Sequence, residues 1–362
     1  RNNNYTEYGV ETSINFPSFL FPFLNSDFKR KIKATTEFGL QYSYQLRPEF
    51  SRTVASASWS YKWTQRQRAQ HRIDLIDIGY LYLPWISNKF REDYINKGQN
   101  HIFEYNYKNR LIARMGYSYN FNSAGNSLVN NTISSNSYSI RANIESAGNI
   151  LYAFSKATGI RKNDDNEYAI LGIPYAQYLK GDFDFAKNIR IDHRNSLAFH
   201  AGFGIAVPYG NAKTIPFEKQ YFSGGASVRG WSVRDLGPGS FPGDGNFLNQ
   251  SGDIKLDASI EYRSKLFWKF QGAVFVDAGN IWTIRDYANQ PGGVFKFNEF
   301  YKQIAVAYGI GLRLDLDFFV LRFDGGMKAI NPAYETQKDH WPIIHPKFSR
   351  DFAFHFAVGY PF

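Results

Sequence analysis

The chain has 362 residues, of which 33 are Phe, 25 Tyr and 7 Trp, and its net charge is +10. It contains no cysteine, which excludes a disulfide framework and a cysteine-ligated metal site. No stretch approaches the ~18–20 consecutive apolar residues of a transmembrane helix. An aromatic content of 18% with a mean hydropathy of −0.42 is typical of a membrane β-barrel, whose rings line two lipid interfaces around a polar lumen.

Apolar and polar residues alternate along the whole chain. In residues 37–46 the apolar side chains occupy every second position, and residues 253–263 and 304–314 repeat the pattern. A period of two over ten or more residues predicts a β-strand, and this length suits a tilted strand of ~9–11 residues that crosses a membrane. About fourteen strands are expected, near residues 5–16, 37–46, 50–63, 69–83, 100–108, 110–121, 136–147, 174–186, 193–207, 253–263, 267–280, 304–314, 318–329 and 350–362.

The alternation also predicts the two faces of the strands. Side chains expected to face lipid are Tyr42, Tyr44, Leu256, Ile260, Val306 and Ile310. Side chains expected to face the lumen are Glu37, Lys255, Glu261, Asp277 and Arg313. A soluble β-sandwich is the alternative, but its strands would be ~5–6 residues long. We therefore expect an all-β protein, a transmembrane antiparallel β-barrel.

The connections between the predicted strands differ in length. Residues 47–49 and 108–110 are tight turns, whereas the long connections are 84–100, 122–135, 148–173 and 208–252. Short turns at one rim and long loops at the other are typical of an outer-membrane barrel. Within residues 146–162 the apolar side chains are spaced by about 3.6, which predicts a short helix inside a loop.

The segment 351–362 has an apolar residue at every second position and ends in Phe. It resembles the C-terminal assembly signal of outer-membrane barrels, in which aromatic residues are spaced by two before a final Phe. The candidate residues of this last strand are Phe354, Phe356, Val358, Gly359, Tyr360 and Phe362. Pro361 removes one backbone donor, which is tolerated near the end of an edge strand.

The long connection 208–252 contains a second candidate motif, which consists of Val228, Arg229, Gly230 and Trp231. Glycine lets the backbone turn tightly and approach other groups closely, and a loop of this length in a compact fold is usually functional. The motif resembles the Val-Arg-Gly-aromatic motif of the sixth extracellular loop in the BamA/TamA superfamily. The resemblance covers about residues 5–362, and residues 216–225 are closer to the TamA-like branch.

The resemblance implies that Arg229 folds into the lumen and pairs with acids of the next two strands, here Glu261 and Asp277. The alternation independently places both acids on the polar face. A guanidinium in a lumen needs carboxylate partners in fork geometry. The family has a sixteen-stranded barrel preceded by POTRA-like domains. Residues 1–362 are therefore expected to be one barrel domain of a longer chain, without the family's first strands.

The resemblance also implies a function, as an assembly or translocation factor of the cell outer membrane. Such a factor would insert or export client proteins through a lateral seam between the first and last strands, whose sheet edges can pair with an incoming strand. Expected partners are outer-membrane lipids, client β-barrel or exported proteins, and periplasmic or lipoprotein accessory subunits. The alternative is a passive outer-membrane pore or transporter, whose lumen would stay open instead of holding residues 221–250.

Motifs of other chemistry are missing from the sequence. The seven histidines lack metal-ligand spacing, and no motif of a serine hydrolase or a nucleotide-binding loop is in place. The basic runs 29–31 and 66–68 lie between strands and are expected to be rim charge near anionic headgroups instead of a nucleic-acid surface. We therefore expect no enzymatic activity, no catalytic residues, no cofactor, no metal and no nucleic-acid partner.

Overall fold

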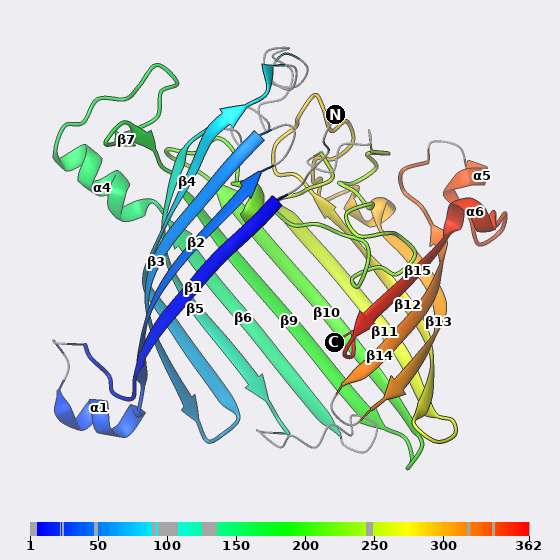
Figure 1. Ribbon diagram of the computed structural model, residues 1–362. Coiled ribbons are helices and arrows are strands. Elements are labelled where there is room, and N and C mark those ends of the chain that lie inside the picture. Colours follow the sequence, from blue (N-terminus) through cyan, green and yellow to red (C-terminus); the bar gives the residue numbers. More distant parts are fainter. Residues whose placement is uncertain are drawn as a thin grey trace. The chain divides into compact units, whose positions relative to one another are not determined.

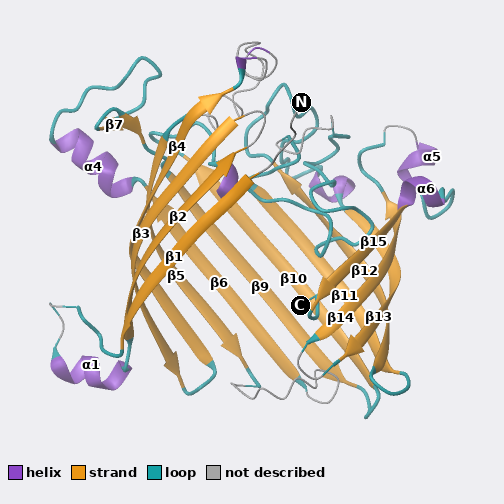
Figure 2. Cartoon of the chain, viewed as in Figure 1, coloured by secondary structure: helices purple, strands orange, loops and turns teal. Residues whose placement is uncertain are grey.

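The computed structural model describes residues 6–21, 23, 25–46, 50–88, 92, 108–124, 136–243, 249–316, 319–334 and 337–361. Within these residues, thirteen strands follow one another in chain order in one sheet, and two short strands form a separate hairpin (Figures 1 and 2). The sheet strands are β1 (Thr6–Phe16), β2 (Thr35–Leu46), β3 (Phe50–Gln65), β4 (Ala69–Ile86), β5 (Arg110–Asn122), β6 (Ser137–Ala147), β9 (Tyr178–Arg190), β10 (Asn195–Pro208), β11 (Ile254–Lys265), β12 (Phe270–Trp282), β13 (Ala305–Asp315), β14 (Val320–Ile330) and β15 (Phe352–Val358). The hairpin strands are β7 (Ala169–Ile170) and β8 (Ile173–Pro174).

Each of the thirteen sheet strands coincides with a predicted strand, and the remaining predicted segment, near 100–108, lies outside the described residues except at its end. The described helices are α1 (Ser26–Ile32), α4 (Asn149–Ala157), α5 (Gln337–His340), α6 (Phe348–Asp351), and the 3-10 turns η2 (Phe217–Lys219) and η3 (Phe300–Gln303). The helix α4 confirms the short helix predicted within residues 146–162. None of the helices in the described ranges could serve as a transmembrane helix.

The chain divides into two compact units. The first unit consists of residues 1–120, 142–181 and 206–219, and the second of residues 121–141, 182–205 and 220–362. In the first unit β1 to β4 pair antiparallel in sequence order. In the second unit β10 to β15 pair in the same way, so that their side chains line up in rows across the strands.

The strands of the second unit expose their apolar face and bury their polar face. Ile260 and Ile310 are 49% and 70% exposed, whereas Glu261 and Asp277 on the other face are fully buried. A soluble protein does the reverse, because ionised side chains are rarely buried and apolar rows are rarely left in water. The predicted alternation is therefore confirmed in these strands, and its sense suits a sheet whose apolar face meets lipid.

The last strand is shorter than predicted. β15 ends at Val358, and Gly359 follows with φ +96°, in the left-handed region that glycine adopts without steric cost. This change of direction takes Tyr360 out of the predicted apolar row, and its hydroxyl donates a hydrogen bond to Gln271 Oε1 at 3.0 Å. Phe362 lies outside the described residues. The residues that keep the exposed row are Phe354, Phe356 and Val358.

The assignment of the two faces can be tested by cysteine labelling, because residues 1–362 contain no cysteine. A cysteine at Ile310 is expected to react with a lipid-soluble maleimide and to resist a charged, water-soluble one. A cysteine at Lys255, which lies on the polar face beside Asp257, is expected to show the opposite preference. Equal labelling of both positions by the water-soluble reagent would contradict the assignment of the faces.

Candidate functional site

The candidate site is built by the connection between β10 and β11. Tyr221 and Gly252 close the base of this loop, since each donates its backbone N–H to the other's carbonyl at 2.8 and 2.9 Å. Within the loop, the Gly225 N–H donates to the Trp231 carbonyl at 2.8 Å. The Val-Arg-Gly-Trp motif therefore lies on a tight turn whose ends are tied together, which limits the positions that Arg229 can reach.

Arg229 is fully buried, and its guanidinium is held by two carboxylates of neighbouring strands, with a third contact, from Nη1 to Asp324 Oδ2, at 3.4 Å. Its Nε and Nη2 donate to the two carboxylate oxygens of Asp277 at 2.7 and 2.8 Å, in fork geometry. Its Nη1 donates to Glu261 Oε2 at 2.5 Å. The backbone N–H of Arg229 also donates to Asp277 Oδ2 at 3.0 Å, and the guanidinium lies 3.5 Å from the centroid of the Phe275 ring. The loop is thus tied to β11 and β12 by charge-assisted hydrogen bonds, the stronger class.

Further arginines and one more acid extend these contacts across the strands. Arg313 donates to Glu261 Oε2 at 3.1 Å and to Asp324 Oδ1 at 2.5 Å. The other two arginines in contact are Arg263, on Glu261 at 2.8 Å, and Arg322, on Asp324 at 3.3 Å. We call these residues the Arg229 cluster; its members are Arg229, Glu261, Arg263, Asp277, Arg313, Arg322 and Asp324. Four arginines against three carboxylates give a formal charge of 4 − 3 = +1, so most of the buried charge is compensated.

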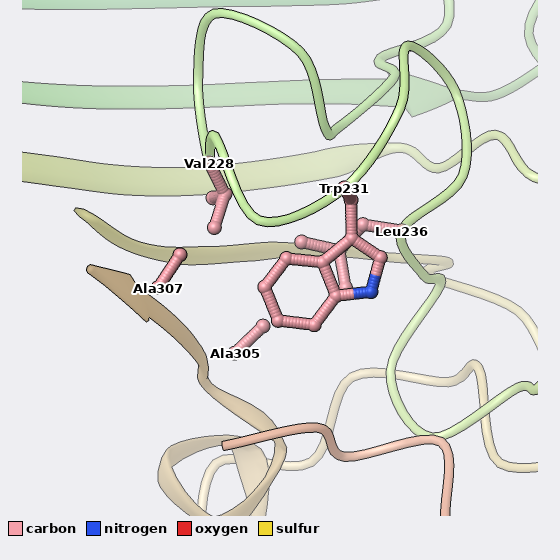
Figure 3. Close-up of a cluster of buried hydrophobic side chains, with 5 residues drawn as sticks. All are labelled: Val228, Trp231, Leu236, Ala305 and Ala307. Atoms are coloured by element: carbon pink, nitrogen blue, oxygen red, sulfur yellow. The ribbon is translucent and has the colours of Figure 1, made fainter. Parts of the chain in front are cut away.

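Apolar packing holds the flanks of the motif. Val228, Trp231 and Leu236 of the loop are buried against Ala305 and Ala307 of β13 (Figure 3). The small alanines leave room for the indole ring, which points toward them from the loop (Figure 3). Trp231 is 3% exposed, so its truncation to alanine would remove buried apolar contacts and leave a cavity beside Ala305 and Ala307.

Glycine allows the loop to approach β13 and β14 closely. A Cβ at Gly230 would lie 2.8 Å from the Ala307 Cβ, and a Cβ at Gly326 would lie 2.0 Å from the Arg229 carbonyl oxygen. Both distances are shorter than non-bonded atoms tolerate. The glycine of the motif and a glycine of β14 are therefore both needed for the loop to reach its position.

The last strand also contacts the motif. The ring Nε2 of His355, in β15, lies 3.0 Å from the Arg229 carbonyl oxygen. Because a carbonyl oxygen only accepts, this nitrogen carries the proton and donates it. The loop is therefore in contact with all five strands from β11 to β15 of the second unit.

The structure brings together Arg229, Glu261 and Asp277, the three residues that the family resemblance had paired. Sequence reasoning had placed Arg313 on the polar face without linking it to the motif. It missed Arg263, Asp324 and His355 as contacts. Alternation within 318–329 could have placed Asp324 on the polar face, but no sequence signal links it to Arg229, 95 residues away. Among the described residues, no group of three or more His, Asp or Glu side chains is placed to hold a metal ion.

One buried acid beside the loop predicts a pH dependence. Asp253 precedes β11 and is 1% exposed, and burial raises its pKa to about 6 although the Ile284 N–H donates to it at 3.0 Å. A carboxyl whose pKa is raised on folding binds its proton more tightly when folded. Stability therefore rises as the pH falls through the window from about 6 to the ordinary 3.8. At neutral pH the buried carboxylate costs about 3 kcal/mol, at 1.36 kcal/mol per unit.

Asp253→Asn is therefore expected to stabilise the protein at pH 7.5 and to remove most of the gain in stability expected between pH 7 and pH 4.5. Urea unfolding in lipid vesicles at several pH values measures this. The exposed Asp286 provides the control, because Asp286→Asn should leave the pH dependence as it is. An unchanged pH profile in Asp253→Asn would show that another group causes it.

Long strands with an exposed apolar face, and a buried polar face covered by a loop, define an integral β-barrel protein of the outer-membrane class. The Omp85 superfamily domain matches residues 1–362, and the chain belongs to that superfamily. This membership confirms the predicted barrel fold and the predicted location in the cell outer membrane, and it confirms the BamA/TamA resemblance at the level of the superfamily.

Two BamA proteins are similar to this chain. The outer membrane protein assembly factor BamA of Neisseria meningitidis serogroup B is 34% identical over 94 residues, which cover 23% of this chain and 11% of that protein. The crystal structure of BamA from Haemophilus ducreyi lacking POTRA domains 1–3 matches with a TM-score of 0.62 at 18% identity. That match covers 98% of this chain and 62% of the other, and it shows the fold. The chain spans less than two thirds of the length of either protein.

Proposed function

We propose that this chain is the membrane-embedded part of an outer-membrane protein assembly or export factor, which handles client proteins without enzymatic turnover. Membership of the Omp85 superfamily and the name of the Neisseria relative, an assembly factor, support this proposal. The observation that carries it is the Arg229 cluster, which ties a long loop to the polar face of the second unit.

The loop has a defined mechanical role in this proposal. A loop held by several buried ionic hydrogen bonds on β11 and β12 is fixed, and through His355 it also touches β15. A displacement of the last strand would therefore disturb the contact between His355 and the loop, and a displaced loop would remove that contact from the strand. A diffusion pore needs no such link.

The client contact in this proposal is a sheet edge. β15 is the last strand in the strand order of the described residues, and a strand at the end of a sheet carries backbone donors and acceptors along its outer edge. An incoming client strand would pair with such an edge by β-augmentation and pass through a lateral seam. β15 is short, and Gly359 and Pro361 weaken pairing beyond Val358, which favours exchange at this edge.

Residues 216–225 favour a TamA-like role over a BamA-like role. The partners we propose are outer-membrane lipids, client β-barrel or exported proteins, and periplasmic or lipoprotein accessory subunits. The chain is proposed to be a barrel domain of a longer protein, as the share of the relatives that it covers suggests.

Site-specific photo-crosslinking in the host bacterium tests the proposal. A crosslinking residue at Phe356 of β15 is expected to capture newly made outer-membrane or exported proteins. The control is Ile310 of β13, which is exposed on the same kind of face two strands away and should capture none. Equal capture at both positions, or none at Phe356, would remove the seam from the proposal.

A passive pore makes a different prediction for the same strain. Depletion of a pore would slow the uptake of small solutes and leave the amounts of other outer-membrane proteins normal. Depletion of an assembly or export factor lowers the amount of folded or exported client protein, which is measured by heat-modifiable electrophoretic mobility and by secretion assays.

A further inference from the structure

The connection between β1 and β2 is much longer than the short turns at the same end of the strands. The turns after β3, β9, β11 and β13 have three or four residues. Because neighbouring strands are antiparallel, every second connection lies at the same end of the strands. The connection after β1 therefore lies at the same end as these turns, but it spans residues 17–34 and contains α1. Short turns of outer-membrane barrels lie at the periplasmic rim. This segment therefore lies at the rim that faces the periplasmic leaflet.

The first half of this segment is an aromatic platform fixed to the strands. Thr36 Oγ1 donates to the Ser18 carbonyl at 2.7 Å and accepts from the Leu20 N–H at 3.0 Å. The Phe19 ring packs edge-on against Tyr61 with 4.6 Å between centroids. On this fixed support Phe23 is 86% exposed. An aromatic side chain left so exposed at the edge of a lipid-facing surface is suited to the membrane interface.

The second half, α1, carries positive charge. Lys29, Arg30 and Lys31 lie in its last turn against a single acid, Asp27, a balance of 3 − 1 = +2. No described residue forms an ion pair with the three basic side chains. Figure 1 shows α1 projecting sideways from the end of β1, beside the strands of the first unit. Lys33, which follows, lines a different, polar pocket with Lys62 and Arg72.

A groove lies on the apolar face of the same strands. Ala55 and Ala57 of β3 are opposite Tyr42 and Leu40 of β2, and opposite Tyr80 and Ile78 of β4. Small side chains between two rows of large ones leave a trough of about 520 Å³ lined mostly by apolar atoms. Thr12 of β1, at its edge, is four residues before Phe16, or ~13 Å along a strand. Half of the bilayer core is ~15 Å, so one acyl chain covers this distance.

We propose that the first unit binds an anionic phospholipid of the periplasmic leaflet. The headgroup phosphate lies on Lys29, Arg30 and Lys31, beside the aromatic platform, and an acyl chain lies along Ala55 and Ala57. A basic rim alone would attract any anionic surface, and an apolar trough alone any lipid. The distance between the basic rim and the apolar trough along β1 to β3 fits one molecule that has both a phosphate and an acyl chain.

Titration of the delipidated full-length protein with defined lipids, followed by native mass spectrometry, tests the site. Phosphatidylglycerol is expected to bind more tightly than phosphatidylcholine. Arg30→Gln with Lys31→Gln should weaken the binding of phosphatidylglycerol about 25-fold, at roughly fivefold per charge, and leave the binding of phosphatidylcholine unchanged. Ala57→Leu, which fills the trough, should weaken both lipids.

Two matched variants serve as controls. Arg66→Gln with Arg68→Gln removes two charges from the short turn after β3, and Ala258→Leu enlarges an exposed position of β11. Both should bind phosphatidylglycerol like the natural protein, and heat-modifiable mobility checks that each variant is folded. Equal binding of the two phospholipids, equal losses in both charge variants, or tighter binding of lipopolysaccharide would overturn the proposal. None of these outcomes depends on the client-handling function.

Discussion

Replacing Arg229 with alanine is expected to release the loop between β10 and β11 and to lower the free energy of unfolding by about 3–5 kcal/mol. The size follows from what the change leaves behind. Asp277 loses its fork partner and Glu261 loses one of its donors, while both carboxylates stay buried. A buried charge without its partner costs more than the pair contributed, because its desolvation is no longer offset. Urea unfolding in lipid vesicles measures the loss, and protease cleavage within residues 221–243 reports the released loop.

Two further variants separate the charge effect from simple truncation. Arg234→Ala removes an arginine of the same loop that stacks on Phe222 and lies outside the cluster, so it should cost far less. Asp277→Asn added to Arg229→Ala removes the orphaned charge and should recover part of the loss. If Arg234→Ala were as harmful as Arg229→Ala, the loop would be held by packing, and the cluster would lose its proposed role.

Replacing Gly326 with alanine is expected to force the Arg229 motif away from β14. The new Cβ would stand 2.0 Å from the Arg229 carbonyl oxygen and 2.6 Å from the carbonyl carbon, both backbone atoms that cannot rotate away. Either the motif leaves β14 or the strand distorts, and overpacking of this kind typically costs about 1–3 kcal/mol. Displacing the motif would also break the hydrogen bond from His355 to the Arg229 carbonyl.

The neighbouring Gly325 provides the control for this substitution. A Cβ there would meet only the Phe352 ring, at 3.1 Å, which is a side chain at the edge of the sheet. Gly325→Ala should therefore change stability by less than 1 kcal/mol and leave the loop protected from protease. Similar losses of stability in the two variants would indicate that β14 tolerates no larger residue at either glycine. They would argue against a specific contact between the motif and Gly326.

The strands and the direction of their two faces could be predicted from local sequence patterns. A strand's alternation is a local property, because successive side chains point to opposite sides whatever the rest of the chain does. Residues 253–263 and 304–314 could therefore be assigned as strands, with Ile260 and Ile310 on one face and Glu261 on the other. The pairing of Arg229 with its two acids could also be predicted, but only through the resemblance to a family. Spacing alone does not say which carboxylate an arginine will meet.

Contacts between residues that are distant in the sequence could not be predicted in this way. Asp324 of β14 and His355 of β15 contact the motif because the loop extends over the polar face of the sheet as far as these two strands. No local sequence pattern predicts these contacts. The end of the last strand was predicted wrongly, since alternation continues to Phe362 in the sequence. One glycine in the left-handed region redirects the backbone after Val358 and takes Tyr360 to Gln271. Periodicity describes where side chains point while a strand lasts, and a single change of backbone dihedral ends the strand without altering the pattern of residues.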